Sequence, residues 1–300
     1  MRETVAVNYV LALVGVLGVS ASGPLMAATQ APALAIAFWR NALATTGLVP
    51  VAAVTRRAEL RGLSRTDLRV SVFAGLMLAC HFATWVTALK LTSVAAATAM
   101  VCTQIGWIVL IDRLRGQSVS RAVLLGLVFS FSGVLVISGV DLSLSPRALL
   151  GDLLGLLGGL FAAIYTISGA KARQSLSTTT YTTLCYGVCA VALIAVCLAS
   201  GRQLIGFSAT TWLGLVAVTL SAQILGHSVF NHLLAVMSPA LVSLVLLLEV
   251  PGAALLAGIF LGQTPAVGVY VGLVLILGGL AIVVTRRPPA EDEVGLNPAD

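Results

Sequence analysis

A single acidic side chain stands in the middle of a long apolar stretch. Residues 238–263 read SPALVSLVLLLEVPGAALLAGIFLGQ, which places Glu249 among leucines and valines. The stretch is long enough to cross a bilayer as a helix. A carboxylate at that depth costs roughly 2.5–3.5 kcal/mol on insertion scales, and Pro251 removes a backbone donor two residues later. Such a residue is a candidate for binding a substrate or a proton.

A related pattern occurs earlier in the chain. Residues 93–117, SVAAATAMVCTQIGWIVLIDRLRGQ, align with residues 238–263 from the first serine onward, and this register places Gln104 opposite Glu249. Both stretches are therefore polar at the same depth. Two related spanning helices of this kind predict a duplicated membrane protein with a central site.

Polar side chains also recur at helical spacing in two other apolar segments. His81 and Trp85 lie four residues apart, and Gln223, His227 and Asn231 follow one another at the same interval. Side chains four apart share a helix face, so each set predicts a polar stripe that avoids lipid. The stripes favour either a shared cavity, in which a histidine can exchange protons, or hydrogen bonds that hold helices together. For Asn231 we expect packing.

Arg40 and Tyr165 are further candidates at membrane depth. Arg40 lies inside a predicted helix, seven residues from its outer end. Its side chain either extends toward the interface or provides a fixed positive charge that attracts a substrate carboxylate or pairs with an acid. The predicted substrate-binding residues are His81, Trp85, Gln104, Tyr165, His227, Glu249 and Arg40.

The composition defines the class of protein. Of 300 residues, 59% are hydrophobic and 9% are charged, whereas soluble domains carry about 25% charged residues. The chain is therefore predicted to be an integral membrane protein. Its net charge of +6 comes from basic residues at segment ends, which predicts orientation rather than nucleic-acid binding. Five cysteines lie in apolar runs without a Cys-x-x-Cys pair, so we expect no metal and no cofactor.

Apolar windows of helical length predict an all-α fold with ten transmembrane helices. Most lysines and arginines fall on alternate loops and on the two tails, so we expect both termini in the cytoplasm. The windows are 5–27, 33–54, 70–90, 92–111, 120–140, 149–170, 178–200, 209–230, 238–261 and 265–285.

The duplication extends over the whole chain. Helices one to five and six to ten align, and an odd number of helices in each half makes the second repeat enter the membrane in the opposite sense. Inverted repeats are typical of secondary transporters, whose sites lie near the midplane between the halves. We predict a first five-helix repeat at 1–145, a second at 146–287, and a disordered cytoplasmic tail at 288–300.

The order and spacing of several short motifs resemble the drug/metabolite transporter superfamily, specifically its EamA-type ten-helix members. The motifs are Phe38-Trp39-Arg40, Ala88-Leu89-Lys90 with Thr92-Ser93, Gly226-His227 with Phe230-Asn231, Ser238-Pro239-Ala240, Glu249-Val250-Pro251 and Leu261-Gly262-Gln263. Family repeats commonly end in Leu-Gly-Glu, so Gln263 departs from the pattern. The first helix also has no acidic residue, which argues against the proton exchange of the related four-helix multidrug transporters.

The resemblance implies a multi-pass protein of the cytoplasmic (plasma) membrane that moves, and often exports, a small metabolite such as an amino acid by alternating access. Its cavity would be lined by helices 1, 3, 4, 6, 8 and 9. The expected partners are a small-molecule substrate, membrane lipid and, as one option for the coupling ion, protons; no nucleic acid is expected. The protein is not expected to be an enzyme.

Two other function classes stay open on the sequence alone. An intramembrane enzyme acting on a lipid or peptide needs a nucleophile with a base, or a metal cluster, at one depth, and the sequence contains neither His-Glu-x-x-His nor Gly-x-Ser-x-Gly. A passive channel would show rates that do not saturate with substrate.

Overall fold

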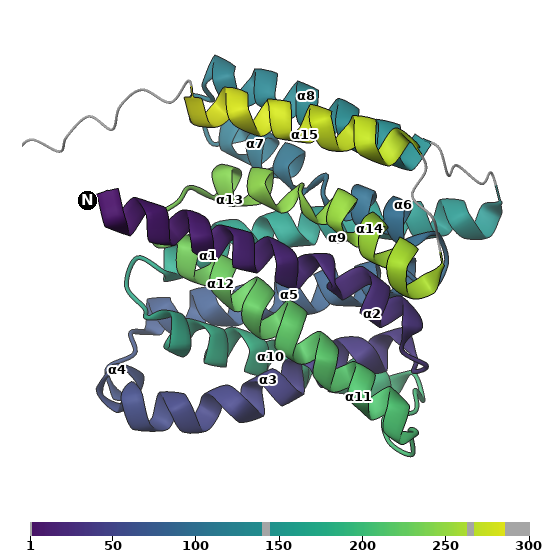
Figure 1. Ribbon diagram of the computed structural model, residues 1–300. Coiled ribbons are helices and arrows are strands. Elements are labelled where there is room, and N and C mark those ends of the chain that lie inside the picture. Colours follow the sequence, from purple (N-terminus) through teal and green to yellow (C-terminus); the bar gives the residue numbers. More distant parts are fainter. Residues whose placement is uncertain (1, 140–144, 263–266, 286–300) are drawn as a thin grey trace, which may run out of the picture.

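The computed structural model describes residues 2–139, 145–262 and 267–285, and this part of the chain folds into helices without a strand (Figure 1). In order, the elements are α1 (Arg2–Ser20), α2 (Ser22–Ala28), α3 (Ala33–Thr55), α4 (Arg57–Arg61), α5 (Arg65–Ala88), α6 (Val94–Val101), α7 (Gln104–Leu114), α8 (Arg121–Gly139), α9 (Pro146–Ala172), α10 (Thr178–Ala199), α11 (Ala209–Val218), the π-helix η1 (Thr219–Ser228), α12 (Val229–Leu233), α13 (Pro239–Leu246), α14 (Glu249–Leu261) and α15 (Val267–Thr285).

Each of the ten predicted segments coincides with a helix or a run of helices. Within the described residues, eight of these are long and apolar enough to cross a membrane. The other two, α8 and α15, contain the shorter apolar helices Arg121–Val136 and Tyr270–Ile282. Ten crossings, cytoplasmic termini and the repeat boundary near residue 145 therefore stay predictions. Gln263, Pro265 and the predicted tail at 288–300 lie outside the described residues.

The two halves of the chain pack against each other with a repeated pattern. Helix α5 packs along α9, and α1, which is equivalent to α9 in the sequence alignment, packs along η1 in the segment equivalent to α5. Helices in equivalent positions also pair with one another, α3 with α10 and α8 with α15. Figure 1 shows the α8–α15 pair side by side along one edge of the bundle, outside the helices that form its centre.

Two of the spanning segments are interrupted near their middle. The Leu247 carbonyl cannot accept a hydrogen bond from residue 251, because proline has no N–H. It accepts one instead from the Val250 N–H, three residues further on, at 3.2 Å. The chain tightens there into 3₁₀ geometry and divides into α13 and α14. The α6–α7 segment is interrupted in the same way, with the Thr103 N–H bonded to the Met100 carbonyl at 3.2 Å.

Glycines of α9 bring this helix close to the interrupted α6–α7 segment. A Cβ added at Gly159 would lie 2.9 Å from the backbone oxygen of Val101, and one at Gly155 would lie 2.7 Å from the Met100 Cβ. Real Cβ atoms are not found at such distances from neighbouring atoms, so only glycine fits. Small residues between membrane helices allow this close approach.

At one end of the bundle, hydrogen bonds join α4 and the first turn of α5 to the α9–α10 connection. The Ser177 N–H donates to the Glu59 carboxylate at 2.6 Å, and the Ser175 hydroxyl donates to Asp67 at 2.6 Å. Nearby, the Arg173 guanidinium donates to the backbone oxygen of Asn231 at 3.0 Å. The Glu59 and Asp67 bonds hold the two halves together at this end, whereas the Arg173 bond lies within the second half.

At the opposite end, Lys90 closes the C-terminus of α2. Its ammonium donates to the carbonyl oxygens of Met26 and Thr29, each at 2.9 Å, and of Ala27 at 3.3 Å. Carbonyls in the last turn of a helix lack intrahelical partners and carry the negative end of its dipole. Burial lowers the pKa of the Lys90 ammonium, and the three carbonyls replace the water that it loses.

The Glu59 contact predicts a pH-dependent contribution to stability. Burial raises the pKa of Glu59, but the hydrogen bonds from Ser177 outweigh it, and the net pKa lies below the ordinary value of 4.5. A carboxyl with a depressed folded-state pKa stabilises fully above its unfolded pKa and loses that contribution as the pH falls through the folded one. Glu59→Gln should therefore lower the stability of the detergent-purified protein by about 0.5–1.5 kcal/mol near neutral pH.

Thermal unfolding of wild type and Glu59→Gln, measured between pH 7 and pH 3.5, checks this expectation. The gap between the two should shrink below about pH 4.5, once Glu59 protonates in both states. Arg57→Gln changes an exposed charge on the same short helix and should leave the pH profile unaltered. A gap that stays constant over the whole range would contradict the assignment.

Candidate functional site: a polar cavity between the two halves

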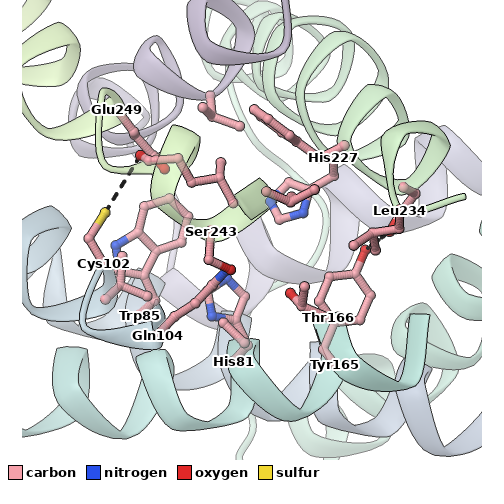
Figure 2. A pocket seen from close by; sticks show the side chains of 17 residues that line it. His81, Trp85, Cys102, Gln104, Tyr165, Thr166, His227, Leu234, Ser243 and Glu249 are labelled. Carbon is pink, nitrogen blue, oxygen red and sulfur yellow. Dashed lines mark hydrogen bonds between the residues drawn. The ribbon is translucent and has the colours of Figure 1, made fainter. Parts of the chain in front are cut away.

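A small cavity lies at the centre of the bundle, between the interrupted segments and α9 (Figure 2). It offers about 50 Å³ to water-sized molecules, and its wall includes residues of α1, α5, α6, α7, α9, η1, α12, α13 and α14. These elements form the predicted helices 1, 3, 4, 6, 8 and 9. Six of the seven predicted site residues line it: His81, Trp85, Gln104, Tyr165, His227 and Glu249.

Gln104 and Glu249 occupy equivalent places, as their alignment predicts. Gln104 is the first residue of α7 and Glu249 the first of α14, so each begins the second half of an interrupted segment. The positive end of the helix dipole lies at this position and favours a carboxylate. The chain therefore places its mid-depth acid where a helix terminus lowers the cost of burying it.

The two equivalent side chains differ in their partners. The Gln104 amide donates to the Ser243 hydroxyl at 2.6 Å and so joins α7 to α13. The Glu249 carboxylate, 7% exposed, has no hydrogen bond within the described part of the chain. Figure 2 shows Glu249 and Trp85 on one side of the cavity, with His227 and Tyr165 on the other. Ser243 was not predicted, because a lone serine in an apolar helix gives no signal before its partner is known.

His81 is held in a defined orientation. Its Nδ1 lies 3.0 Å from the backbone oxygen of Gly158, and because a carbonyl only accepts, Nδ1 must carry a hydrogen. A neutral ring then offers Nε2 as an acceptor. The ring stacks on Trp85 with centroids 5.6 Å apart and an angle of 19°. The indole nitrogen of Trp85 is buried and has no partner among the described residues.

His227 lies on the π-helix η1, which changes the predicted polar stripe. A π-helix closes its hydrogen bonds five residues apart instead of four, so Gln223, His227 and Asn231 no longer share one face. Gln223 points away from the cavity toward α3, while the other two line the cavity. The side chains avoid lipid, as the sequence predicts, because Gln223 and Asn231 are buried and His227 lines the cavity, but the three do not all face the cavity.

Asn231 serves packing, as expected, and also reaches the cavity. Its amide oxygen accepts a hydrogen bond from the Tyr165 hydroxyl at 2.8 Å, and its amide nitrogen donates to the Tyr186 hydroxyl at 3.2 Å. Tyr186 in turn lies 3.1 Å from the Ser228 hydroxyl. This network ties α9, α10 and α12 together and fixes Tyr165 in the cavity wall.

Arg40 does not line the cavity. Its side chain is fully buried, and its Nε donates to the Gln223 amide oxygen at 2.8 Å. The guanidinium carbon lies 4.1 Å above the ring of Phe82, and His227 contacts the same ring edge-on with centroids 5.3 Å apart. Of the two predicted alternatives, extension toward the interface does not occur. The charge lies one side-chain layer behind the wall and pairs with no carboxylate among the described residues.

The lining can bind a small molecule by charge, hydrogen bonds and aromatic contact. It presents one carboxylate, two imidazoles, two amides, hydroxyls and three aromatic rings. In the described residues no group of three or more His, Cys, Asp or Glu side chains is placed to hold a metal ion.

The fold and this cavity define a helical membrane protein built from two similar halves. The profile of the EamA-like transporter family matches residues 7–139 and again residues 149–285. The chain therefore belongs to the EamA-like transporter family, and the predicted duplication is confirmed.

Two individual proteins are similar to this chain. An uncharacterized transporter of Archaeoglobus fulgidus is 24% identical over 234 residues, covering 76% of this chain and 81% of that protein. A protein of known crystal structure, 18% identical, is similar with a TM-score of 0.71 over 93% of this chain and 97% of its own. At that identity the structural likeness shows the fold alone.

The Asn231 network predicts coupling between two wall residues. Asn231→Leu leaves the buried Tyr165 hydroxyl without a partner and should cost about 1–3 kcal/mol of stability. In the double variant Asn231→Leu/Tyr165→Phe the orphaned hydroxyl is gone, so its cost should be smaller than the sum of the single costs. Chemical unfolding of the four proteins in detergent measures the coupling energy. Additive costs would show that the 2.8 Å contact contributes nothing.

Proposed function

We propose that this protein is a secondary transporter that exports a small metabolite, such as an amino acid, across the plasma membrane by alternating access. The central cavity carries this proposal: it lies between the two halves and is lined by residues from both, with an acid and a glutamine at the interrupted helices. Substrate sites of carriers with repeated folds lie at such interfaces, beside discontinuous helices. Membership of a transporter family supports the same conclusion.

The small size of the cavity supports a closed state for the described conformation in this proposal. A space of about 50 Å³ holds a few water molecules, whereas pockets that bind metabolites measure roughly 300–1,000 Å³. In our proposal the halves move apart at one end to admit the substrate and at the other to release it. The Glu59 and Asp67 bonds join the two halves at one end, so in this proposal they must break when that end opens.

Substitution of His81, which lies in the cavity wall, provides the first test. A ligand that binds only the folded state at 100 times its Kd adds about 2.7 kcal/mol of stability, which thermal unfolding detects. We expect at least one member of an amino-acid panel to stabilise the wild type in detergent and to exchange against its labelled form in proteoliposomes. His81→Ala should abolish both effects.

His232→Ala is the matched control, because His232 is exposed and contacts Thr178 rather than the cavity. It should retain binding and exchange. A ligand that stabilises wild type and His81→Ala equally would place its site elsewhere and contradict the cavity. Exchange that does not saturate with substrate would argue for a channel.

Proton coupling is the finer part of the proposal, and Glu249 is its candidate. If this carboxylate carries the driving proton, a pH gradient should accelerate uptake into proteoliposomes for wild type but not for Glu249→Gln. Size-exclusion chromatography and the insertion yield verify that the variant is folded. Equal gradient dependence in both proteins would remove Glu249 from the coupling mechanism.

A further inference from the structure

The cavity wall carries a negative group and no permanent positive one. Among the residues that line it, Glu249 is the one acid, and the basic side chains are the two imidazoles. The Glu249 carboxylate has no hydrogen bond within the described residues, although it lies in the wall and is 7% exposed. Buried charges in proteins are ordinarily paired. An unpaired carboxylate at the edge of a cavity therefore indicates a cationic partner that the chain itself does not supply.

Arg40 does not give the cavity a binding site for an anionic group. The guanidinium carbon lies 4.1 Å from the centroid of the Phe82 ring, and His227, which lines the cavity, contacts the same ring in a T-shaped arrangement. A carboxylate in the cavity would have to displace Phe82, which is fully buried, to reach Arg40. The positive charge is thus shielded from the cavity by a packed ring, whereas the negative charge is open to it.

Aromatic side chains complete the surroundings of Glu249. Trp85, Tyr165 and Phe230 line the same cavity, and Figure 2 shows Trp85 on the side where Glu249 lies and Tyr165 on the other. The faces of aromatic rings attract cations, indole most strongly. The Trp85 N–H has no partner among the described residues, so it is available to an acceptor atom on the same ligand.

We propose that Glu249 binds a protonated amine, and that the substrates of this carrier are amines with an apolar or aromatic body. The inference rests on the proposed function, because it assigns the chemistry of that same cavity. Amino acids satisfy it through their ammonium group, and decarboxylated amines satisfy it equally. Carboxylic acids that lack an amine do not.

A matched series of phenyl compounds tests the inference on the wild type alone. Phenethylamine, phenethyl alcohol and 3-phenylpropionate share one body and differ in charge, and phenylalanine carries both charges. Binding to the detergent-purified protein is measured by thermal unfolding against ligand concentration. We expect the amine and the amino acid to bind at least about tenfold more tightly than the alcohol, the ratio that loss of a charge-assisted hydrogen bond produces. The acid should bind no better than the alcohol.

Two variants assign the preference to Glu249. Glu249→Gln keeps the shape and removes the charge, so it should bind the amine and the alcohol with the same affinity. Glu249→Asp keeps the charge on a shorter side chain and should retain part of the preference. Thermal unfolding without ligand verifies that both variants are folded, and the wild-type series stands if either one is not.

The outcomes separate failure of this inference from failure of the proposed function. Acid bound more tightly than amine, with binding lost in His81→Ala, would overturn amine recognition and leave the cavity as the transport site. Amine binding that survives both Glu249→Gln and His81→Ala would overturn both. No binding of any of the four compounds to wild type would overturn the inference, since it predicts a measurable amine site.

Discussion

The burial of one carboxylate at membrane depth is the constraint around which this bundle is arranged. Glu249 is tolerable there because three features coincide at one level. The proline at 251 interrupts the backbone ladder, the break makes Glu249 the first residue of a new helix, and the neighbouring helices leave a polar cavity in front of it. The helix start lowers the cost of the charge through the helix dipole, and the cavity keeps the carboxylate out of lipid.

The same constraint accounts for the close packing and the irregular backbone of the surrounding helices. Helix α9 approaches the α6–α7 segment so closely that only glycine fits at two of its positions, and it also contributes Tyr165 to the cavity wall. The π-helical turn on η1 lets Gln223 hold Arg40 while His227 faces the cavity. A regular α-helix would have turned both side chains in nearly the same direction. Irregular backbone is tolerated at this depth because it is buried in protein or lines a cavity.

The sequence predicted the helical segments and the six wall residues well, for a physical reason. Span length is set by the bilayer, and a polar residue in an apolar span must avoid lipid, so both follow from composition at each position. The alignment of the two repeats supplied the shared depth of Gln104 and Glu249. The sequence did not predict the directions in which the side chains of Gln223 and Arg40 point. The face on which Gln223 lies depends on the π-helical turn, and the position of Arg40 depends on the packing of Phe82 and α3. Neither the π-turn nor this packing produces a periodic pattern in the sequence. Ser243 is significant only through its contact with Gln104.

Gln104 and Glu249 occupy equivalent positions but differ in their hydrogen-bond partners, and this difference has a further consequence. Thr98 stands five residues after Ser93, as Ser243 stands five after Ser238, and its hydroxyl is buried without a partner among the described residues. The bond between Gln104 and Ser243 therefore has a symmetry-related counterpart, Glu249 with Thr98, that is left unmade. Gene duplication has thus left an interface that is hydrogen-bonded at Gln104 and Ser243 and unbonded at the equivalent place, so the two sides of the cavity are chemically different.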